Sequence, residues 1–189
     1  MKFTAGQIPG TFTIDIVKAE DERGFFARMW CAREFREHGL PETLSQASIS
    51  WNRERGTLRG MHLQRSPSQE AKVVRCVRGS IFDAIVDLRP ESPTFLHAAT
   101  FELSASNHRA LYVPPGCAHG FQTLAPDTEV HYQMTDEYRA DLSVGYRWND
   151  PLFAISWPLE PTIMSTRDRN YPDLDRQDCN AFRSISPAG

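Results

Sequence analysis

Residues 72–88, KVVRCVRGSIFDAIVDL, decide the fold class of this 189-residue chain. Two runs rich in β-branched and apolar residues, 72–77 and 80–88, are separated only by Arg78 and Gly79. A glycine between two such runs predicts two strands joined by a tight turn.

The second run also indicates what its two faces contact. Its even positions from 82 to 88 are all apolar, whereas its odd positions from 81 to 87 alternate Ile with Asp. Successive side chains of a strand point to opposite faces, so one face is apolar and the other is mixed. A mixed face is typical of a sandwich or barrel that encloses a partly polar cavity.

Further short β-type segments follow at the spacing of a sandwich or barrel. They are predicted at 11–17, 98–103, 110–113, 120–124, 130–134 and 146–148. One helix is predicted at 32–38, where Gly39 provides a stop. Strands and helices do not alternate, so a doubly wound parallel sheet is disfavoured. The sequence thus predicts an all-β domain with loops and short helices after Pro151.

The composition of the chain excludes some classes of function. The net charge is 21 − 24 = −3 and 40% of residues are hydrophobic, which is typical of one globular domain and unlike a basic nucleic-acid binder. Of the 21 basic residues 18 are arginines, and Lys72 is one of three lysines. No secretory signal or 18-residue apolar run is found, and the four cysteines are widely spaced. We therefore expect a cytoplasmic protein with reduced thiols and neither membrane nor nucleic acid as partner.

Two segments place histidines among apolar residues: 56–64, GTLRGMHLQ, and 114–121, PPGCAHGF. Each alone is compatible with a half-buried structural histidine or with turn chemistry. Together they resemble the two-part pattern of cupin barrels, with His62 in the first part and His119 in the second. Metal-binding cupins have a second histidine where this chain has Gln64 and an acid near Lys72. An amide is a poor ligand and a lysine repels cations, so we expect no bound metal.

The combined motifs resemble the dTDP-4-dehydrorhamnose 3,5-epimerase family over residues 11–168. They are ERGFF, GTLRGMHLQ, EAKVVRCVRGSIFDAIVDLR with ESPTF, PPGCAHGF, VHYQMTDEY, YRWNDP, ISWP and MSTRD. The resemblance implies a cupin jelly-roll β-barrel or sandwich with short peripheral helices. The single domain, 1–189, would comprise an N-terminal arm at 1–45, a barrel at 46–150 and a C-terminal segment at 151–189.

The resemblance also implies a reaction and its catalytic residues. The family epimerises C3 and C5 of a nucleotide-linked 4-keto-6-deoxyhexose through an enolate and needs no cofactor. His62 would be the base, Asp168 would orient it, Lys72 would stabilise the enolate, and Tyr132 would be the acid. Taken singly, Tyr132 would be interpreted as a barrel-lining aromatic residue and Asp168 as a surface acid.

The substrate would be held by a second group of residues, again by resemblance. These are Arg23, Phe26, Gln46, Arg59, Gln64, His119 and Tyr138, with the two arginines suited to the diphosphate. The arm of one subunit would reach into its partner, which implies a homodimer.

Three departures from the family pattern fall near the expected pocket: Arg28, Ser48 and Leu63. They leave the nucleotide, the sugar and the number of inverted centres open. Two alternatives also remain, a cupin 3,4-ketoisomerase of a nucleotide sugar and a non-catalytic cupin that binds a sugar nucleotide.

Overall fold

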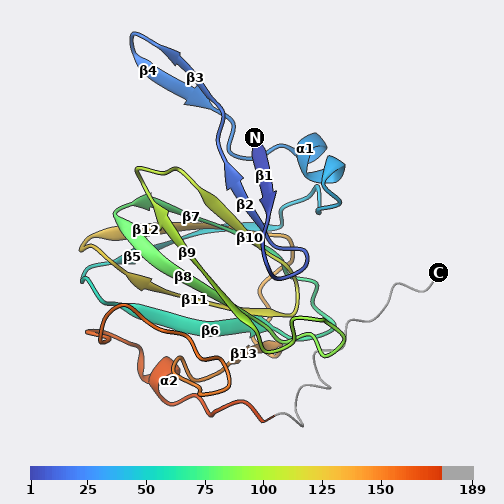
Figure 1. Ribbon diagram of the computed structural model, residues 1–189, viewed down its shortest axis with the longest axis vertical. Coiled ribbons are helices and arrows are strands. Elements are labelled where there is room, and N and C mark those ends of the chain that lie inside the picture. The colour runs from blue at the N-terminus through green and yellow to red at the C-terminus, as the bar shows by residue number, and fades with distance from the viewer. Residues whose placement is uncertain (176–189) are drawn as a thin grey trace, which may run out of the picture.

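The computed structural model describes residues 1–175 and shows two antiparallel sheets packed face to face (Figure 1). The six-stranded sheet has the order β1-β2-β10-β7-β12-β5. Its strands are β1 (Lys2–Ala5), β2 (Phe12–Asp15), β5 (Gln46–Asn52), β7 (Lys72–Arg78), β10 (Ala110–Val113) and β12 (Thr128–Met134). The expected all-β fold of the cupin type is confirmed.

The second sheet has five strands in the order β13-β6-β11-β8-β9. They are β6 (Leu58–Gln64), β8 (Ser80–Asp87), β9 (Ala98–Ser104), β11 (Cys117–Thr123) and β13 (Ser143–Gly145). A separate hairpin of β3 (Lys18–Asp21) and β4 (Gly24–Ala27) projects from the barrel. The two short helices are α1 (Ala32–Glu37) and α2 (Thr166–Arg169).

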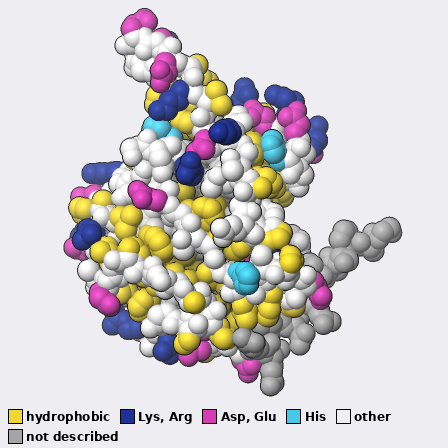
Figure 2. Space-filling view, in the orientation of Figure 1, with side chains coloured by type: hydrophobic (Ala, Val, Ile, Leu, Met, Phe, Trp, Pro, Cys, Tyr) yellow, Lys and Arg dark blue, Asp and Glu magenta, His cyan; other side chains and the backbone are white. Residues whose placement is uncertain are grey.

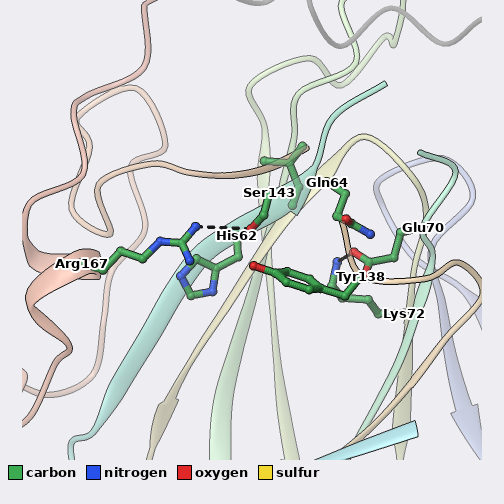
Figure 3. A pocket seen from close by; sticks show the side chains of 8 residues that line it. His62, Gln64, Glu70, Lys72, Tyr138, Ser143 and Arg167 are labelled. Atoms are coloured by element: carbon green, nitrogen blue, oxygen red, sulfur yellow. Dashed lines mark hydrogen bonds and ion pairs between the residues drawn. The ribbon is translucent and has the colours of Figure 1, made fainter. Parts of the chain in front are cut away.

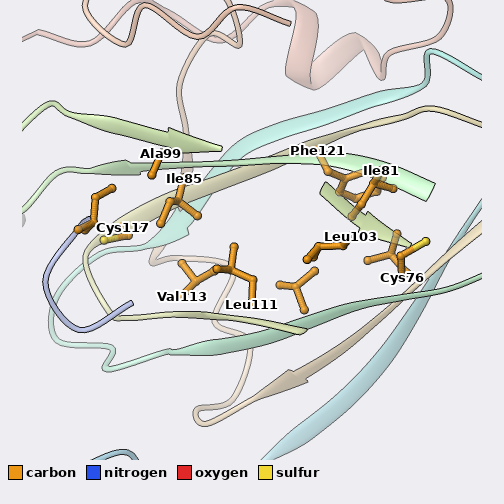
Figure 4. Packing of buried hydrophobic residues seen from close by; sticks show 12 residues of the cluster. Cys76, Ile81, Ile85, Ala99, Leu103, Leu111, Val113, Cys117 and Phe121 are labelled. Atoms are coloured by element: carbon orange, nitrogen blue, oxygen red, sulfur yellow. The ribbon is translucent and has the colours of Figure 1, made fainter. Parts of the chain in front are cut away.

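The space between the sheets is filled by apolar side chains from both (Figure 4). Ile81 and Ile85 of β8 contribute to this cluster, together with Val74 and Cys76 of β7. The mixed face of β8 therefore points into the barrel, as its pattern predicted. The apolar face of β8 points outward and packs beneath the C-terminal segment, where Val86 contacts the second cluster.

The turn at Gly79 joins two strands, β7 and β8, as the sequence predicted. The two strands nevertheless belong to different sheets and do not pair. Gly79 has φ 77°, and a Cβ there would lie 2.3 Å from Thr128 Oγ1. The turn thus carries the chain from one sheet to the other at a point where only glycine fits.

The last predicted strand was wrong. The segment 146–148 was expected to be extended, but β13 begins at Ser143 and ends at Gly145. Tyr146 exchanges two backbone hydrogen bonds with Met61, of 2.9 and 3.1 Å, and pairing ends there. The described cysteines, Cys31, Cys76 and Cys117, are free thiols, while Cys179 lies outside the described residues.

Candidate active site

His62 and Asp168 form a dyad at one end of the barrel. His62 Nε2 lies 2.8 Å from Asp168 Oδ1. This contact joins β6, which carries His62, to α2, which carries Asp168. Asp168 Oδ2 accepts a hydrogen bond of 3.2 Å from the Gly60 amide, and the Asp168 amide donates to Ser165 Oγ at 3.0 Å. These contacts fix both carboxylate oxygens. Because Nε2 is engaged, Nδ1 is the ring nitrogen left for a substrate.

The charge of Asp168 is maintained although the residue is buried. Burial raises the pKa of this carboxyl, but the hydrogen bonds from His62, Gly60 and Ser165 outweigh it and hold the net pKa below its usual value. A carboxylate that stays ionised can orient an imidazole and stabilise its protonated form.

A β-bulge in β6 turns Arg59 to the same face as His62. His62 is opposite His119 on β11 and Arg59 is opposite Phe121, so between these pairs two residues of β6, Gly60 and Met61, face one residue of β11. Phe121 belongs to the barrel-interior cluster, and directly opposed residues share a face. Arg59 therefore points inward, where its Nε donates to Asn52 at 2.8 Å.

Two glycines allow β6 and β11 to approach each other closely at this bulge. A Cβ on Gly60 would lie 2.5 Å from the Gly120 Cα, and a Cβ on Gly120 would lie 2.7 Å from Met61 Sδ. Gly60 also has φ 138°, which side chains rarely adopt.

His119 continues the polar cluster inside the barrel. Its Nε2 lies 2.8 Å from Asp83 Oδ2, and both residues are buried. Burial raises the pKa of Asp83, and the contact with His119 opposes that shift only in part. The His119 ring packs edge-on against Tyr132, with centroids 5.9 Å apart.

Tyr132 projects from the opposite sheet to His62. It lies on β12 opposite Val74, whose side chain belongs to the interior cluster. Burial and the charge of Asp83 raise the pKa of Tyr132 well above its ordinary value, so the phenol keeps its proton near neutral pH.

Lys72 forms part of the wall of the pocket that also contains His62. This pocket has a volume of about 210 Å³ and is shown in Figure 3. Lys72 is largely buried and forms an ion pair with Glu70, which is buried too. Lys72 shares the inward face of β7 with Val74, because they are two residues apart.

Tyr138 is held over the pocket by two glutamines. Its amide donates to Gln46 Oε1 at 2.7 Å, while Gln64 receives the Arg139 amide at 2.6 Å and donates to the Glu137 carbonyl at 3.0 Å. The side-chain amides of Gln46 and Gln64 therefore bind protein backbone. Both position the segment that carries Tyr138. Gln64 also lines the pocket, where a substrate contact was expected (Figure 3).

Of the seven expected substrate contacts, Gln64 and Tyr138 line this pocket, and two others lie outside the barrel altogether. Arg23 and Phe26 lie on the β3–β4 hairpin, which stands clear of the barrel (Figures 1 and 2). The Arg23 side chain is 83% exposed and pairs with Asp21, and Phe26 is 80% exposed.

Four site residues were missed by sequence reasoning. They are Glu70, Asp83, Ser143 and Arg167. Arg167 donates to Ser143 Oγ at 3.3 Å, and its pKa is raised, first by a hydrogen bond to Tyr138. The sequence held a signal for two of these residues. Arg167 stands next to Asp168 in the MSTRD motif, and Asp83 lies on the mixed face of β8.

The three departures have separate environments. Arg28 donates to Glu34 of α1 at 3.0 Å. Ser48 is opposite Tyr132 and so shares its inward face. Leu63 is buried in the cluster beneath the C-terminal segment and borders the His62 pocket.

Residues 1–175 contain neither a cluster of metal ligands nor a membrane-spanning helix. No group of three or more His, Cys, Asp or Glu side chains in this part of the chain could hold a metal ion. Neither described helix is long and apolar enough to span a membrane.

Comparisons with known proteins agree on one family. The family model for dTDP-4-dehydrorhamnose 3,5-epimerase matches residues 5–176. A relative of that name from Sinorhizobium fredii is 40% identical over 158 residues, which is 83% of this chain and 81% of the relative.

Two solved structures illustrate the range of the family. A Bacillus anthracis dTDP-4-dehydrorhamnose 3,5-epimerase with TDP and PPi bound is 39% identical, has a TM-score of 0.88 and covers 92% of this chain and 99% of its own. ChmJ from Streptomyces bikiniensis, a 3′-monoepimerase in complex with dTDP-quinovose, is 29% identical, has a TM-score of 0.85 and covers 94% and 91%.

Proposed function

Because this chain belongs to the dTDP-4-dehydrorhamnose 3,5-epimerase family and is a nucleotide-sugar epimerase, we propose that it inverts C3, C5 or both in a dTDP-linked 4-keto-6-deoxyhexose. The observation that carries this proposal is the arrangement of His62 and Tyr132, which project into one barrel from opposite sheets. Epimerisation needs a base on one face of the sugar and an acid on the other.

His62 is the proposed base. A proton leaves the carbon next to the C4 ketone and passes to Nδ1, while Nε2–H is donated to Asp168. The electron pair of the broken C–H bond forms the enolate, whose oxygen carries the negative charge. Lys72, the lysine of the pocket wall, would stabilise that oxygen.

Tyr132 is the proposed acid. Its raised pKa keeps the phenol protonated, so it can deliver a proton to the enolate carbon on the face away from His62. The C4 ketone is thereby restored and the carbon next to it is inverted. The step requires no organic cofactor.

The nucleotide end requires cations and an aromatic surface. Arg59 and Arg167 of the same chain lie near the site. We propose that Arg23 and Phe26 come from a second subunit of a homodimer. The exposure of both side chains on a projecting hairpin supports this.

Deuterium incorporation tests the reaction. The protein is incubated in D₂O with dTDP-4-keto-6-deoxyglucose, and C3 and C5 are followed by NMR. Exchange and inversion at one or both centres are expected, and His62→Ala should abolish both. Absence of exchange with every 4-keto-6-deoxyhexose nucleotide tried would overturn the proposal. The number of centres distinguishes a one-centre from a two-centre epimerase.

Mixed dimers test the origin of Arg23. Subunits carrying His62→Ala are mixed with subunits carrying Arg23→Ala, each inactive alone. If the arm acts across the dimer, the mixture regains activity at about a quarter of its sites, because half of randomly paired dimers contain one intact site. If the arm acts within its own subunit, no activity returns.

A further inference from the structure

The hydrogen bond to Asp168 does not by itself fix the plane of the His62 ring. It holds one ring atom, Nε2, at 2.8 Å from Asp168 Oδ1, and the imidazole can still swing about that contact. The His62 side chain is 39% exposed, so its surroundings do not enclose it. A base must keep its free nitrogen in line with the reacting carbon, because small displacements cost large factors in rate. A second contact is therefore needed to hold the imidazole.

Tyr171 makes such a contact from the C-terminal segment. Its ring packs edge to face with the His62 imidazole, with centroids 5.8 Å apart and planes at 70°. This arrangement is one of the favoured geometries of aromatic pairs. Asp168 thus holds the imidazole by one nitrogen, and Tyr171 holds it by one side of the ring.

A glycine leaves room for the Tyr171 ring. Gly145 lies directly opposite His62 in the pairing of β13 with β6, and directly opposed residues project to the same face of a sheet. A Cβ on Gly145 would lie 2.2, 2.3 and 2.7 Å from three atoms of the Tyr171 ring. The φ of Gly145 is not positive, so the ring and not the local conformation requires glycine here. The Tyr171 ring therefore stands where β13 would otherwise place a side chain beside His62.

The segment that carries Tyr171 is anchored close to the ring. Helix α2 ends two residues before Tyr171. The Pro172 carbonyl accepts a hydrogen bond of 3.1 Å from the Arg147 amide, and the Leu174 amide donates to Asp150 Oδ2 at 2.5 Å. Leu174 is also buried in the cluster beneath this segment. These contacts fix the backbone on either side of the ring, so the ring can act as a rigid wall.

The ring of Tyr171, and not its hydroxyl, makes the contact with His62. The hydroxyl oxygen is buried and has no hydrogen-bond partner among residues 1–175. Arg167, which approaches the same pocket from α2 (Figure 3), lies over the Tyr171 ring with its guanidinium carbon 5.5 Å from the ring centre. Phenylalanine at position 171 would keep the ring and remove only the hydroxyl.

We propose that Tyr171 is a positioning residue that holds the His62 imidazole in the orientation from which Nδ1 reaches the substrate. Tyr171 acts through His62 and takes no proton itself. This role rests on the proposed function of His62 as the base. Tyr171 lies three residues beyond Asp168, the last residue of the MSTRD motif, so it stands outside the sequence motifs of the site.

Steady-state kinetics separates positioning from binding. Tyr171→Ala should lower kcat at least tenfold and change KM less than threefold, because the substrate still binds while the base is out of line. Tyr171→Phe keeps the ring and should retain at least half of the wild-type kcat. The control is Leu174→Val on the same segment, which should lower the Tm and keep the wild-type kcat. The proposal is overturned if Tyr171→Phe or Leu174→Val loses as much kcat as Tyr171→Ala.

NMR of the protein without substrate tests the His62 ring directly. The protein is labelled with ¹⁵N-histidine at pH 8, and the signals of His62 are identified by their absence from His62→Ala. The wild type and Tyr171→Phe should show one tautomer, with the proton on Nε2, and Tyr171→Ala should show a mixture of both. A single Nε2–H tautomer in Tyr171→Ala would overturn the proposal. Because no substrate is used, this result does not depend on whether the wild type exchanges deuterium.

Gly145→Ala tests the same contact from β13. The added methyl group should displace the Tyr171 ring and lower kcat to the level of Tyr171→Ala, although the ionisable groups of the site are unchanged. In the double variant the space left by Tyr171→Ala accepts the methyl group. The double variant should therefore have the kcat of Tyr171→Ala alone and a higher Tm than Gly145→Ala. Losses in kcat that multiply would overturn the proposal, because the two residues would then act independently.

Discussion

His62 and Asp168 are 106 residues apart in sequence, yet their side chains meet at 2.8 Å. The contact ties a strand of the barrel to a four-residue helix in the C-terminal segment. It also fixes which imidazole nitrogen remains free, and the direction of the proposed proton transfer follows from that.

Replacing Asp168 by Asn should reduce turnover by about 10²- to 10⁴-fold with little effect on KM. The amide keeps the shape of the carboxylate but cannot balance a protonated His62. Steady-state kinetics measures the effect, and Asp173→Asn, an exposed residue of the same segment, is the control. Equal losses in both variants would contradict the orienting role.

The same substitution should alter acid stability. Because the pKa of Asp168 is lowered on folding, its contribution is complete above the unfolded value of about 3.9 and is lost as pH falls through the folded value. The gap in unfolding free energy between the wild type and Asp168→Asn should narrow below pH 4. Chemical denaturation from pH 3 to 7 measures it, and a gap that widens in acid would contradict the lowered pKa.

Tyr132→Phe should separate exchange from inversion. His62 can still remove and return a proton on its own face, so deuterium should enter the substrate while the inverted product falls at least tenfold. NMR in D₂O gives both quantities. Tyr112→Phe, on the outer face of the same sheet, serves as the control. An unchanged product ratio in Tyr132→Phe would place the acid elsewhere.

Asp83→Asn should stabilise the protein at pH 8 and impair its activity. The pKa of Asp83 is raised, so its folded form favours the proton, and wild-type stability relative to the neutral amide decreases as pH rises above about 4. His119 loses its charged partner, so turnover should fall. Thermal unfolding at pH 5 and 8, with kinetics, checks both effects, and a larger destabilisation at pH 8 than at pH 5 would refute the argument.

Gly60→Ala should destabilise the fold by more than about 3 kcal/mol, since the added Cβ meets the Gly120 backbone at 2.5 Å in a strained conformation. The matched control is Gly39→Ala, where φ is also positive but nothing lies within 4 Å. That change should cost only about 1 kcal/mol. Urea unfolding of both variants decides whether close approach, and not φ alone, requires glycine at position 60.

Local patterns predicted much of the barrel correctly. The alternation of Ile and Asp in β8 predicted an inward mixed face, and Ile81 and Ile85 do pack inside. The helix expected at 32–38 corresponds to α1. Strand β5 was missed because its QASISWN sequence is small and polar, and the β3–β4 hairpin was missed because KAED lacks apolar alternation. Both form through pairing with partner strands.

The sequence by itself determined the fold class, the family and the residue types available for proton transfer, because these are encoded in local periodicity and motif order. Only the tertiary structure decided which of those residues share a site. The bulge between the His62–His119 and Arg59–Phe121 pairs turns Arg59 inward, against a strict period of two. Gln46 and Gln64 are committed to backbone, and the hairpin keeps Arg23 away from the pocket of its own chain. These outcomes depend on strand register and long-range contacts, which no local stretch of sequence specifies.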